Sequence, residues 1–165
     1  MSDVYQGEPD RGEEAMKAIE LAKEVLAQEA AALVVVRDQE VLYVRHGGGL
    51  RPLFDLVQEV GQDLAGSVIA DKLTGQTAAR LYQEVGIVEV FAYTMSAKAS
   101  EILDQAGIKY QTGRIVDKIM NRTQDDLCPM EKIAEGSTSN QEMMAKIQAF
   151  FDQVDLKKAQ KSGGN

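Results

Sequence analysis

Cysteine, histidine, proline and tryptophan are scarce in this chain of 165 residues, which holds one cysteine, one histidine, three prolines and no tryptophan. A single cysteine excludes an internal disulfide and a cysteine-rich zinc site. A chain without disulfides fits a reducing compartment, so we predict a cytoplasmic protein. The opening residues carry no basic segment followed by an apolar one, and no secretory signal is predicted.

Long apolar runs and an excess of basic residues are also lacking. The longest apolar run, AAALVVV over residues 30–36, is too short to cross a bilayer, so no membrane partner is expected. Lys and Arg total 18 against 26 Asp and Glu, for a net charge of -8. This charge repels phosphate backbones and disfavours a nucleic-acid polymer as partner. A small anionic ligand stays compatible with it, because local amides and one or two bases can outweigh the global charge.

The length and the 44% hydrophobic content suit one compact domain with a single core. We predict this domain over residues 14–156. The polar residues 1–13 are expected to form a flexible N-terminal arm, and residues 157–165, which include KKAQKSGGN, a flexible C-terminal tail.

The apolar periodicity alternates between helix and strand. EEAMKAIELAKEVLAQEAAAL predicts an amphipathic helix, and LVVVRD and EVLYVRH predict two strands joined by a turn at Asp38-Gln39. LFDLVQEVG predicts a short helix, and the segment from Gly66 to Gly86 starts extended and becomes helical near Asp71. Further helices are predicted over residues 96–107, 114–122, 128–136 and 140–154, and further strands over residues 87–95 and 108–111. This order predicts an α/β fold with three α/β/α layers and a mixed sheet that begins with an antiparallel hairpin.

The order and four motifs resemble a family of small prokaryotic proteins with a cytidine-deaminase-like fold, known as a domain of unknown function. The motifs are the hairpin segment LVVVRDQEVLYVRHGGGLRPLFDL, the sequence ADK before a helix rich in small residues, ILDQAGIKY, and NRT followed by CPME. They span about residues 30–132. The resemblance implies a deaminase-like sheet with a pocket, and it implies no particular reaction.

Active deaminases of this fold hold zinc through a His or Cys in an H/C-x-E motif that opens one helix and through P-C-x-x-C at the next. The corresponding segments here begin with Ala70-Asp71-Lys72 and with MSAKAS, and neither supplies a His or Cys. We therefore predict a deaminase-like protein without catalytic zinc. The sequence does not identify a cofactor.

Asp71 and Lys72 are predicted to lie at a strand-to-helix junction, where α/β proteins bind ligands. In the catalytic interpretation, Asp71 acts as a base or orients Lys72, and Lys72 holds negative charge. In the structural interpretation, Asp71 caps the helix and Lys72 is solvated. Ser96, the predicted cap of the following helix, is a further ligand-binding candidate.

The segment HGGGLRP is the second candidate. Its glycines, with Gly48 at the centre, allow the backbone to approach a ligand closely. Arg51 can pair with a carboxylate or phosphate through its planar guanidinium group. The alternative is a flexible connection after the strand.

The segment NRTQDDLCPMEKI contains the single cysteine, Cys128. Pro129 suits the first position of a helix, which places Cys128 at the N-cap, where a thiolate is stabilised. The functional interpretation makes Cys128 a nucleophile or proton donor, with Asn121 and Arg122 on the ligand. In the structural one, Cys128 caps the helix and Glu131 completes a capping box.

We therefore predict a metal-free pocket that combines Asp71, the Gly47–Arg51 loop and the segment Asn121–Glu131. It would bind a small polar, nucleotide-like ligand, and Cys128 would assist any reaction. Two alternatives stay open: a ligand-binding or sensor module without turnover, and a protein-interaction domain that uses Phe150 or Phe151 of the last helix. The composition is also compatible with a homo-oligomer.

Overall fold

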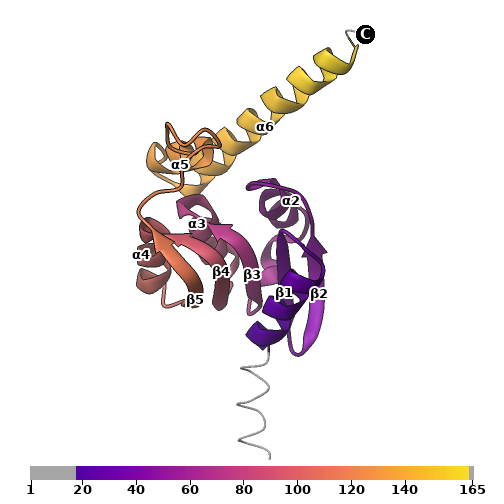
Figure 1. Ribbon diagram of the computed structural model, residues 1–165, viewed down its shortest axis with the longest axis vertical. Coiled ribbons are helices and arrows are strands. Elements are labelled where there is room, and N and C mark those ends of the chain that lie inside the picture. Colours follow the sequence, from indigo (N-terminus) through magenta and orange to yellow (C-terminus); the bar gives the residue numbers. More distant parts are fainter. Residues whose placement is uncertain (1–17, 164–165) are drawn as a thin grey trace, which may run out of the picture. The chain divides into compact units, whose positions relative to one another are not determined.

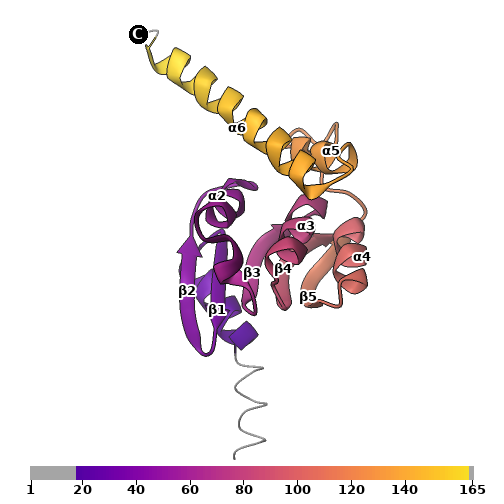
Figure 2. The same ribbon diagram turned by 180° about the vertical axis from the view of Figure 1, so that it is seen from behind.

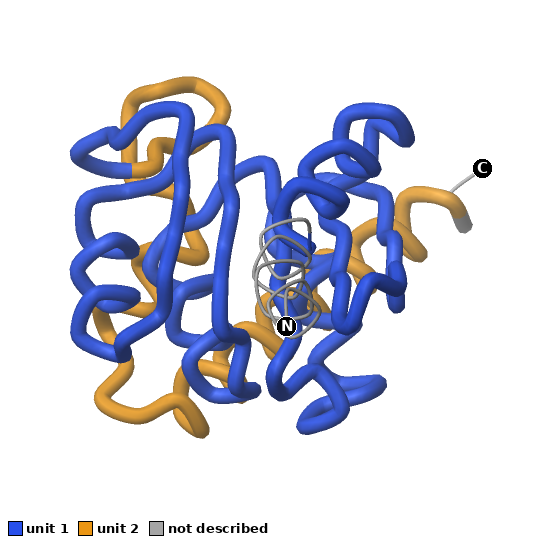
Figure 3. Tube along the Cα trace, turned by 90° about the horizontal axis from the view of Figure 1, so that it is seen from below, with its two compact units in different colours: residues 1–118 blue, residues 119–165 orange. Residues whose placement is uncertain are grey.

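The computed structural model describes residues 18–163, so the predicted N-terminal arm lies outside the described residues. The chain divides into two compact units, Met1–Lys118 and Ile119–Asn165, which Figure 3 colours separately. Each unit is described by itself below. The prediction that residues 14–156 act as one domain stays a prediction.

The first unit contains one mixed sheet of five strands in the order β2-β1-β3-β4-β5 (Figure 1). β1 pairs with both β2 and β3 in antiparallel fashion, and β3, β4 and β5 run parallel. The strands are β1 (Leu33–Arg37), β2 (Glu40–Arg45), β3 (Val68–Thr74), β4 (Glu89–Ser96) and β5 (Lys109–Val116).

The predicted hairpin is confirmed. Asp38 and Gln39 form its turn with φ angles of 50° and 70°. Positive φ at both turn residues matches the right-handed twist of the paired strands, and Asp tolerates this conformation better than most residues. The pairing of β1 with β2 shifts register between Val35 and Val36, which marks a bulge.

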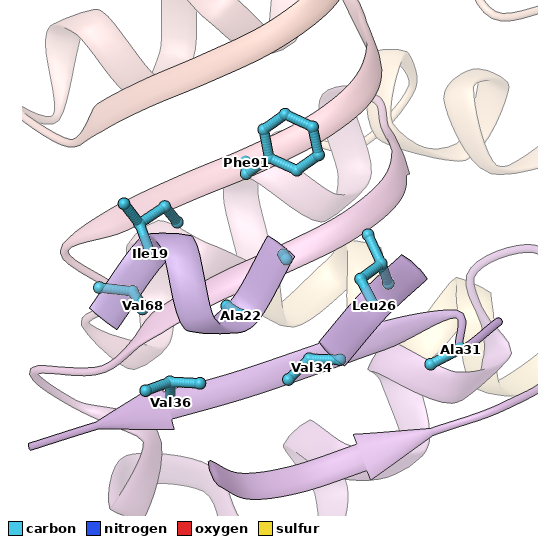
Figure 4. Close-up of a cluster of buried hydrophobic side chains, with 9 residues drawn as sticks. Ile19, Ala22, Leu26, Ala31, Val34, Val36, Val68 and Phe91 are labelled. Atoms are coloured by element: carbon cyan, nitrogen blue, oxygen red, sulfur yellow. The ribbon is translucent and has the colours of Figure 1, made fainter. Parts of the chain in front are cut away.

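A helix over residues 18–28 covers one face of the sheet. The sequence spacing predicts a stripe of Met16, Ile19, Ala22, Lys23 and Leu26. Ile19, Ala22 and Leu26 are at most 2% exposed and Lys23 is half-buried, while Met16 lies outside the described residues. Figure 4 shows the stripe packed against side chains of β1, β3 and β4, which are Val34, Val36, Val68 and Phe91. This packing is the reason that a continuous valine run forms the centre of the sheet.

The opposite face of the sheet is covered by three helices, which lie in front of it in Figure 2. They are α2 (Arg51–Val60), α3 (Gln76–Val85) and α4 (Ala97–Gln105). The short 3-10 helix η1 (Gly61–Leu64) follows α2. The buried side chains of this layer include Phe54, Leu56, Leu81 and Leu103. Helices on both faces of a mixed sheet give three α/β/α layers, so the predicted three-layer α/β fold with an initial antiparallel hairpin is confirmed.

Two predicted helix boundaries are wrong. β3 continues through Asp71 and Lys72, and α3 begins only at Gln76, after Gly75. Residues 114–116 belong to β5, which pairs in register with β4 as far as Val116, so the helix predicted over 114–122 does not form. In both places the pairing of neighbouring strands overrides the local sequence preference.

The second unit contains α5 (Pro129–Glu135) and α6 (Asn140–Gly163), which pack against each other. Its buried apolar side chains are Ile119, Met130, Ala134, Met143, Ile147 and Phe151. α6 continues through residues 157–163 of the predicted flexible C-terminal tail, and the flexibility of this segment stays a prediction. Lys, Ala and Gln are good helix formers, so KKAQK extends α6 although residues 157–162 are exposed.

Within residues 18–163, every helix is too short or too polar to span a membrane.

Candidate functional site

The ends of four strands meet at one edge of the sheet. Because β1 is antiparallel to both β2 and β3, β2 runs in the same direction as β3, β4 and β5. Leu33 of β1 pairs with Arg45 on one side and with Asp71 on the other. The Gly47–Arg51 loop and the end of β3 therefore leave the sheet at the same edge, which we call the carboxyl edge. Ligands of α/β proteins commonly bind at such an edge.

A group of three side chains, Asp71, Thr74 and Tyr82, lies at the end of β3, and we call it the Asp71 cluster. Oδ2 of Asp71 accepts a hydrogen bond of 2.5 Å from the Tyr82 hydroxyl and one of 3.2 Å from the Thr74 hydroxyl. Tyr82 and Thr74 are fully buried, and Asp71 is half-buried. The cluster joins the sheet to α3 through a carboxylate, which is an uncommon group in a buried layer.

Burial raises the pKa of Asp71 from 3.8 to about 6, because loss of water disfavours the carboxylate more than its hydrogen bonds from Tyr82, Thr74 and two backbone amides favour it. Burial and the neighbouring carboxylate also raise the pKa of Tyr82 well above 10.0, so the phenol stays a donor. Asp71 therefore changes its protonation around pH 6. Such a group can accept, donate or exchange a proton with a bound molecule.

Lys72 does not share the surroundings of Asp71. Adjacent residues of a strand point to opposite faces of the sheet, and Lys72 is exposed. The prediction that Asp71 caps a helix and Lys72 lies in its first turn is therefore wrong. A catalytic role for either residue stays a prediction.

The other candidates of the first unit lie at the carboxyl edge. Gly48 is exposed, and a Cβ atom there would meet no other atom within 4 Å. Gly49 has a φ of 66°, a conformation that favours glycine. Arg51 is half-buried at the start of α2. Ser96 is confirmed as the cap of α4, since its hydroxyl accepts a 3.1 Å hydrogen bond from the amide of Ala99.

In the second unit, Cys128 is half-buried and occupies the N-cap of α5, as predicted. Its side chain makes no capping hydrogen bond. Its backbone carbonyl accepts hydrogen bonds from the amides of Glu131 and Lys132 at 2.9 and 3.1 Å. Glu131 is 6% exposed in the first turn. The roles of Cys128 as nucleophile and of Glu131 in ligand binding stay predictions.

The loop before Cys128 is closed by its own hydrogen bonds. The side chains of Asn121 and Thr123 both donate to Oδ1 of Asp125, at 3.0 and 2.5 Å. The side-chain oxygen of Asn121 accepts the amide of Asp125 at 3.2 Å, and Asp126 pairs with Lys132. These bonds hold the pKa values of both aspartates below 3.8. Asn121 thus has a structural role, while Arg122 is exposed.

The predicted convergence of Asp71 and the Gly47–Arg51 loop with Cys128 combines residues of both units, and it stays a prediction. The use of α6 as an interaction surface also stays a prediction. Within α6, Phe151 is buried, and Phe150 is 36% exposed and meets the ring of Phe151 edge to face.

Sequence reasoning missed Tyr82 and Thr74. Tyr82 lies on the same face of its helix as the apolar residues Ala78, Leu81 and Val85, which predicts burial of the tyrosine. A buried tyrosine hydroxyl needs a hydrogen-bond partner, and Asp71 is the one acid of the neighbouring strand. The need of Tyr82 for a hydrogen-bond partner could have predicted its contact with Asp71. That prediction requires Asp71 to lie inside the strand, whereas the sequence pattern placed it at the start of a helix.

Among residues 18–163, no three or more His, Cys, Asp or Glu side chains gather where they could hold a metal ion.

The fold and the Asp71 cluster define a class: an α/β/α protein with a mixed five-stranded sheet and a titrating carboxylate at its carboxyl edge. The chain belongs to the TM1506 family, Domain of unknown function (DUF1893), which it matches over residues 21–151. The family predicted from the motifs is thereby confirmed.

A crystal structure of a DUF1893 family protein (TM1506) from Thermotoga maritima is similar to this chain, with a TM-score of 0.73 and 17% identity. The match covers 81% of this chain and 89% of that chain, and at this identity it shows a shared fold.

Two deaminase structures match with lower scores. A diaminohydroxyphosphoribosylaminopyrimidine deaminase/5-amino-6-(5-phosphoribosylamino)uracil reductase from Thermotoga maritima has a TM-score of 0.40 and 22% identity, over 59% of this chain and 35% of that chain. A dCMP deaminase from the cyanophage S-TIM5 has a TM-score of 0.41 and 12% identity, over 63% of this chain and 98% of that chain. No curated protein matches the chain.

Proposed function

We propose that this protein binds a small polar ligand with an anionic group, such as a nucleotide, at the carboxyl edge of its sheet. The observation that carries the proposal is the Asp71 cluster. A carboxylate that is half-buried, tied to a helix by a buried tyrosine and titrating at about 6 is costly to keep in a sheet. Groups perturbed in this way concentrate at sites that bind or transform molecules.

The chemistry of Asp71 favours a ligand with donors and acceptors side by side. Oδ2 is occupied by Tyr82 and Thr74, so these two bonds fix the orientation of the carboxyl group. The protonated form can donate a hydrogen bond and the ionised form can only accept. The edge of a nucleobase offers both kinds of partner.

The Gly47–Arg51 loop supports an anionic part of the ligand. The loop follows β2, and Arg45 at the end of β2 lies in register with Leu33, the neighbour of Asp71. Gly48 leaves open space where a side chain would stand. Arg51 follows at the start of α2, and a guanidinium group suits phosphate or carboxylate.

The test begins with native mass spectrometry of gently purified protein and a thermal-shift screen with nucleotides, nucleosides and sugar phosphates. The compound that shifts the melting temperature most is then titrated by calorimetry across pH. Because an ionised Asp71 repels an anion, we expect its affinity to fall above about pH 6, approaching tenfold per pH unit if only the protonated form binds.

Asp71→Asn keeps the shape of the side chain and an acceptor for Tyr82 but does not titrate, so it should remove this pH dependence. Asp55→Asn, an exposed residue of α2, is the control with the same charge change. Equal effects of the two variants would exclude Asp71 from the site. If the purified protein retains no ligand and no compound of the panel shifts its melting temperature, the proposal of a nucleotide-like ligand is wrong.

A further inference from the structure

The two edge strands of the sheet differ in how they are protected. At one edge, β2 is bulged against β1, and Arg45 of β2 both approaches Glu59 at 3.4 Å and lies over the ring of Tyr43. Bulges and charged side chains are the usual means of preventing an edge from pairing with another chain. At the other edge, β5 keeps one register with β4 from Lys109 to Val116, without a shift.

β5 offers a regular row of backbone groups on its outer side. It is eight residues long and contains no proline. Within residues 18–163, its strand partner is β4 alone. Beyond that pairing, Thr112 donates its hydroxyl to the backbone oxygen of Arg114 at 3.0 Å. An exposed edge of this length is a template for one more strand.

The charge of β5 determines which kind of additional strand can pair with it. The segment KYQTGRIV carries Lys109 and Arg114 and no acid, in a chain whose net charge is -8. Both basic residues are exposed. This local charge favours an acidic segment, and it opposes a second copy of β5, which would bring two further bases to the same edge.

Exposed apolar side chains lie next to the outer side of β5. Ile115 of β5 is 51% exposed and Tyr93 of β4 is 43% exposed. Ile115 pairs with Met95, and Met95 and Tyr93 lie two residues apart, so all three belong to one face of the sheet. Gly113 of β5 lies against the backbone of Tyr93, where a Cβ atom would meet the Tyr93 carbonyl oxygen at 2.7 Å, so this position of β5 carries no side chain.

We propose that β5 is an interaction surface that takes an extended acidic peptide segment as a sixth strand. Backbone hydrogen bonds supply the pairing, and Arg114, which lies on the face opposite Ile115 and Tyr93, selects acidic side chains. Ile115 and Tyr93 contact the apolar side chains that alternate with them. The surface is separate from the ligand site, because it uses the outer side of β5 and none of the residues of the Asp71 cluster.

The test uses the full chain, labelled with ¹⁵N, and two short capped peptides that alternate valine with glutamate or valine with lysine. We expect the glutamate peptide to shift the amide signals of β5 and to slow their hydrogen exchange, and the lysine peptide to do neither. Arg114→Glu should weaken the glutamate peptide roughly tenfold and improve the lysine peptide. Lys98→Glu on α4, also exposed, is the control with the same change of charge.

Three results would overturn the proposal. One is β5 amides that respond to neither peptide. Another is an equal loss of affinity in Arg114→Glu and Lys98→Glu, since that would indicate attraction by net charge alone. The third is protection of β5 by self-association of the protein without peptide, seen as a concentration-dependent mass in sedimentation, because the edge would then belong to a second copy. Circular dichroism of both variants verifies that they fold.

Discussion

Each of the two compact units is stabilised internally by a different kind of interaction. In the sheet unit, strands far apart in sequence pair with each other, and helices close over both faces. In the second unit, few apolar side chains are buried, and polar bonds within short segments fix the loop at Asn121 and the start of α6. The first unit is therefore stabilised mainly by its core, and the second by a small core together with local polar bonds.

Removing core volume should have the largest effect and tests this comparison directly. Leu103 in α4 and Ile147 in α6 are both fully buried. Leu103→Ala and Ile147→Ala should each cost about 2–5 kcal/mol, because each removes apolar contacts and leaves a cavity. Hydrogen exchange should show lower protection throughout the strands for Leu103→Ala, and only in α5 and α6 for Ile147→Ala.

The two variants serve as controls for each other, since the lost volume is similar. If Ile147→Ala lowers the protection of the β3–β5 amides as much as Leu103→Ala does, the units unfold as one body and the contrast between them is wrong.

The next effect concerns pH and the Asp71 cluster. The folded chain holds the Asp71 proton more tightly than the unfolded chain, because burial raises the pKa from 3.8 to about 6. This contribution to stability is therefore complete below about pH 4 and is lost as the pH rises through about 6. At neutral pH the ionised group costs about 3 kcal/mol relative to a neutral one.

Asp71→Asn should consequently be more stable than the wild type near pH 7, and the two should approach each other near pH 4. Urea unfolding across this range measures the difference. Asp55→Asn should follow the wild type at every pH. Parallel curves for Asp71→Asn and the wild type would show that the carboxyl group is hydrated in the folded protein.

The smallest expected effect on stability comes from the residues that begin the two helices of the second unit. The Ser139 hydroxyl accepts the amide of Glu142 at 3.1 Å, whereas the Cys128 thiol makes no such bond. Ser139→Ala should cost about 1 kcal/mol and Cys128→Ala less than half as much, because the second variant loses no cap. Thermal unfolding followed by circular dichroism compares them. A greater loss for Cys128→Ala would mean that its thiol stabilises α5.

Most of the fold could be predicted because its signals are local. The turn at Asp38-Gln39 and the stripe Ile19, Ala22 and Leu26 follow from residue type and spacing alone. The path of β3 through Asp71 could not be predicted in this way, since aspartate and lysine favour neither strand nor burial. Pairing with β1 on one side and β4 on the other holds them in the strand.

The candidate site was predictable in part. Asp71, Gly48 and Arg51 were named from the sequence, and the sheet brings all three to its carboxyl edge. Tyr82 was missed because its partner is eleven residues away on another element, and only the packing of α3 on β3 brings the two together. The pKa of Asp71 depends on that packing too, so spacing alone gives no access to it.

The single cysteine has a practical consequence. Cys128 is half-buried rather than sealed, its thiol makes no capping bond, and no other thiol exists in the chain. A nitroxide spin label can therefore be attached at this one position without any substitution in the chain. Broadening of the amide signals of Gly48 and Lys72 would then measure how near the thiol comes to the carboxyl edge of the sheet.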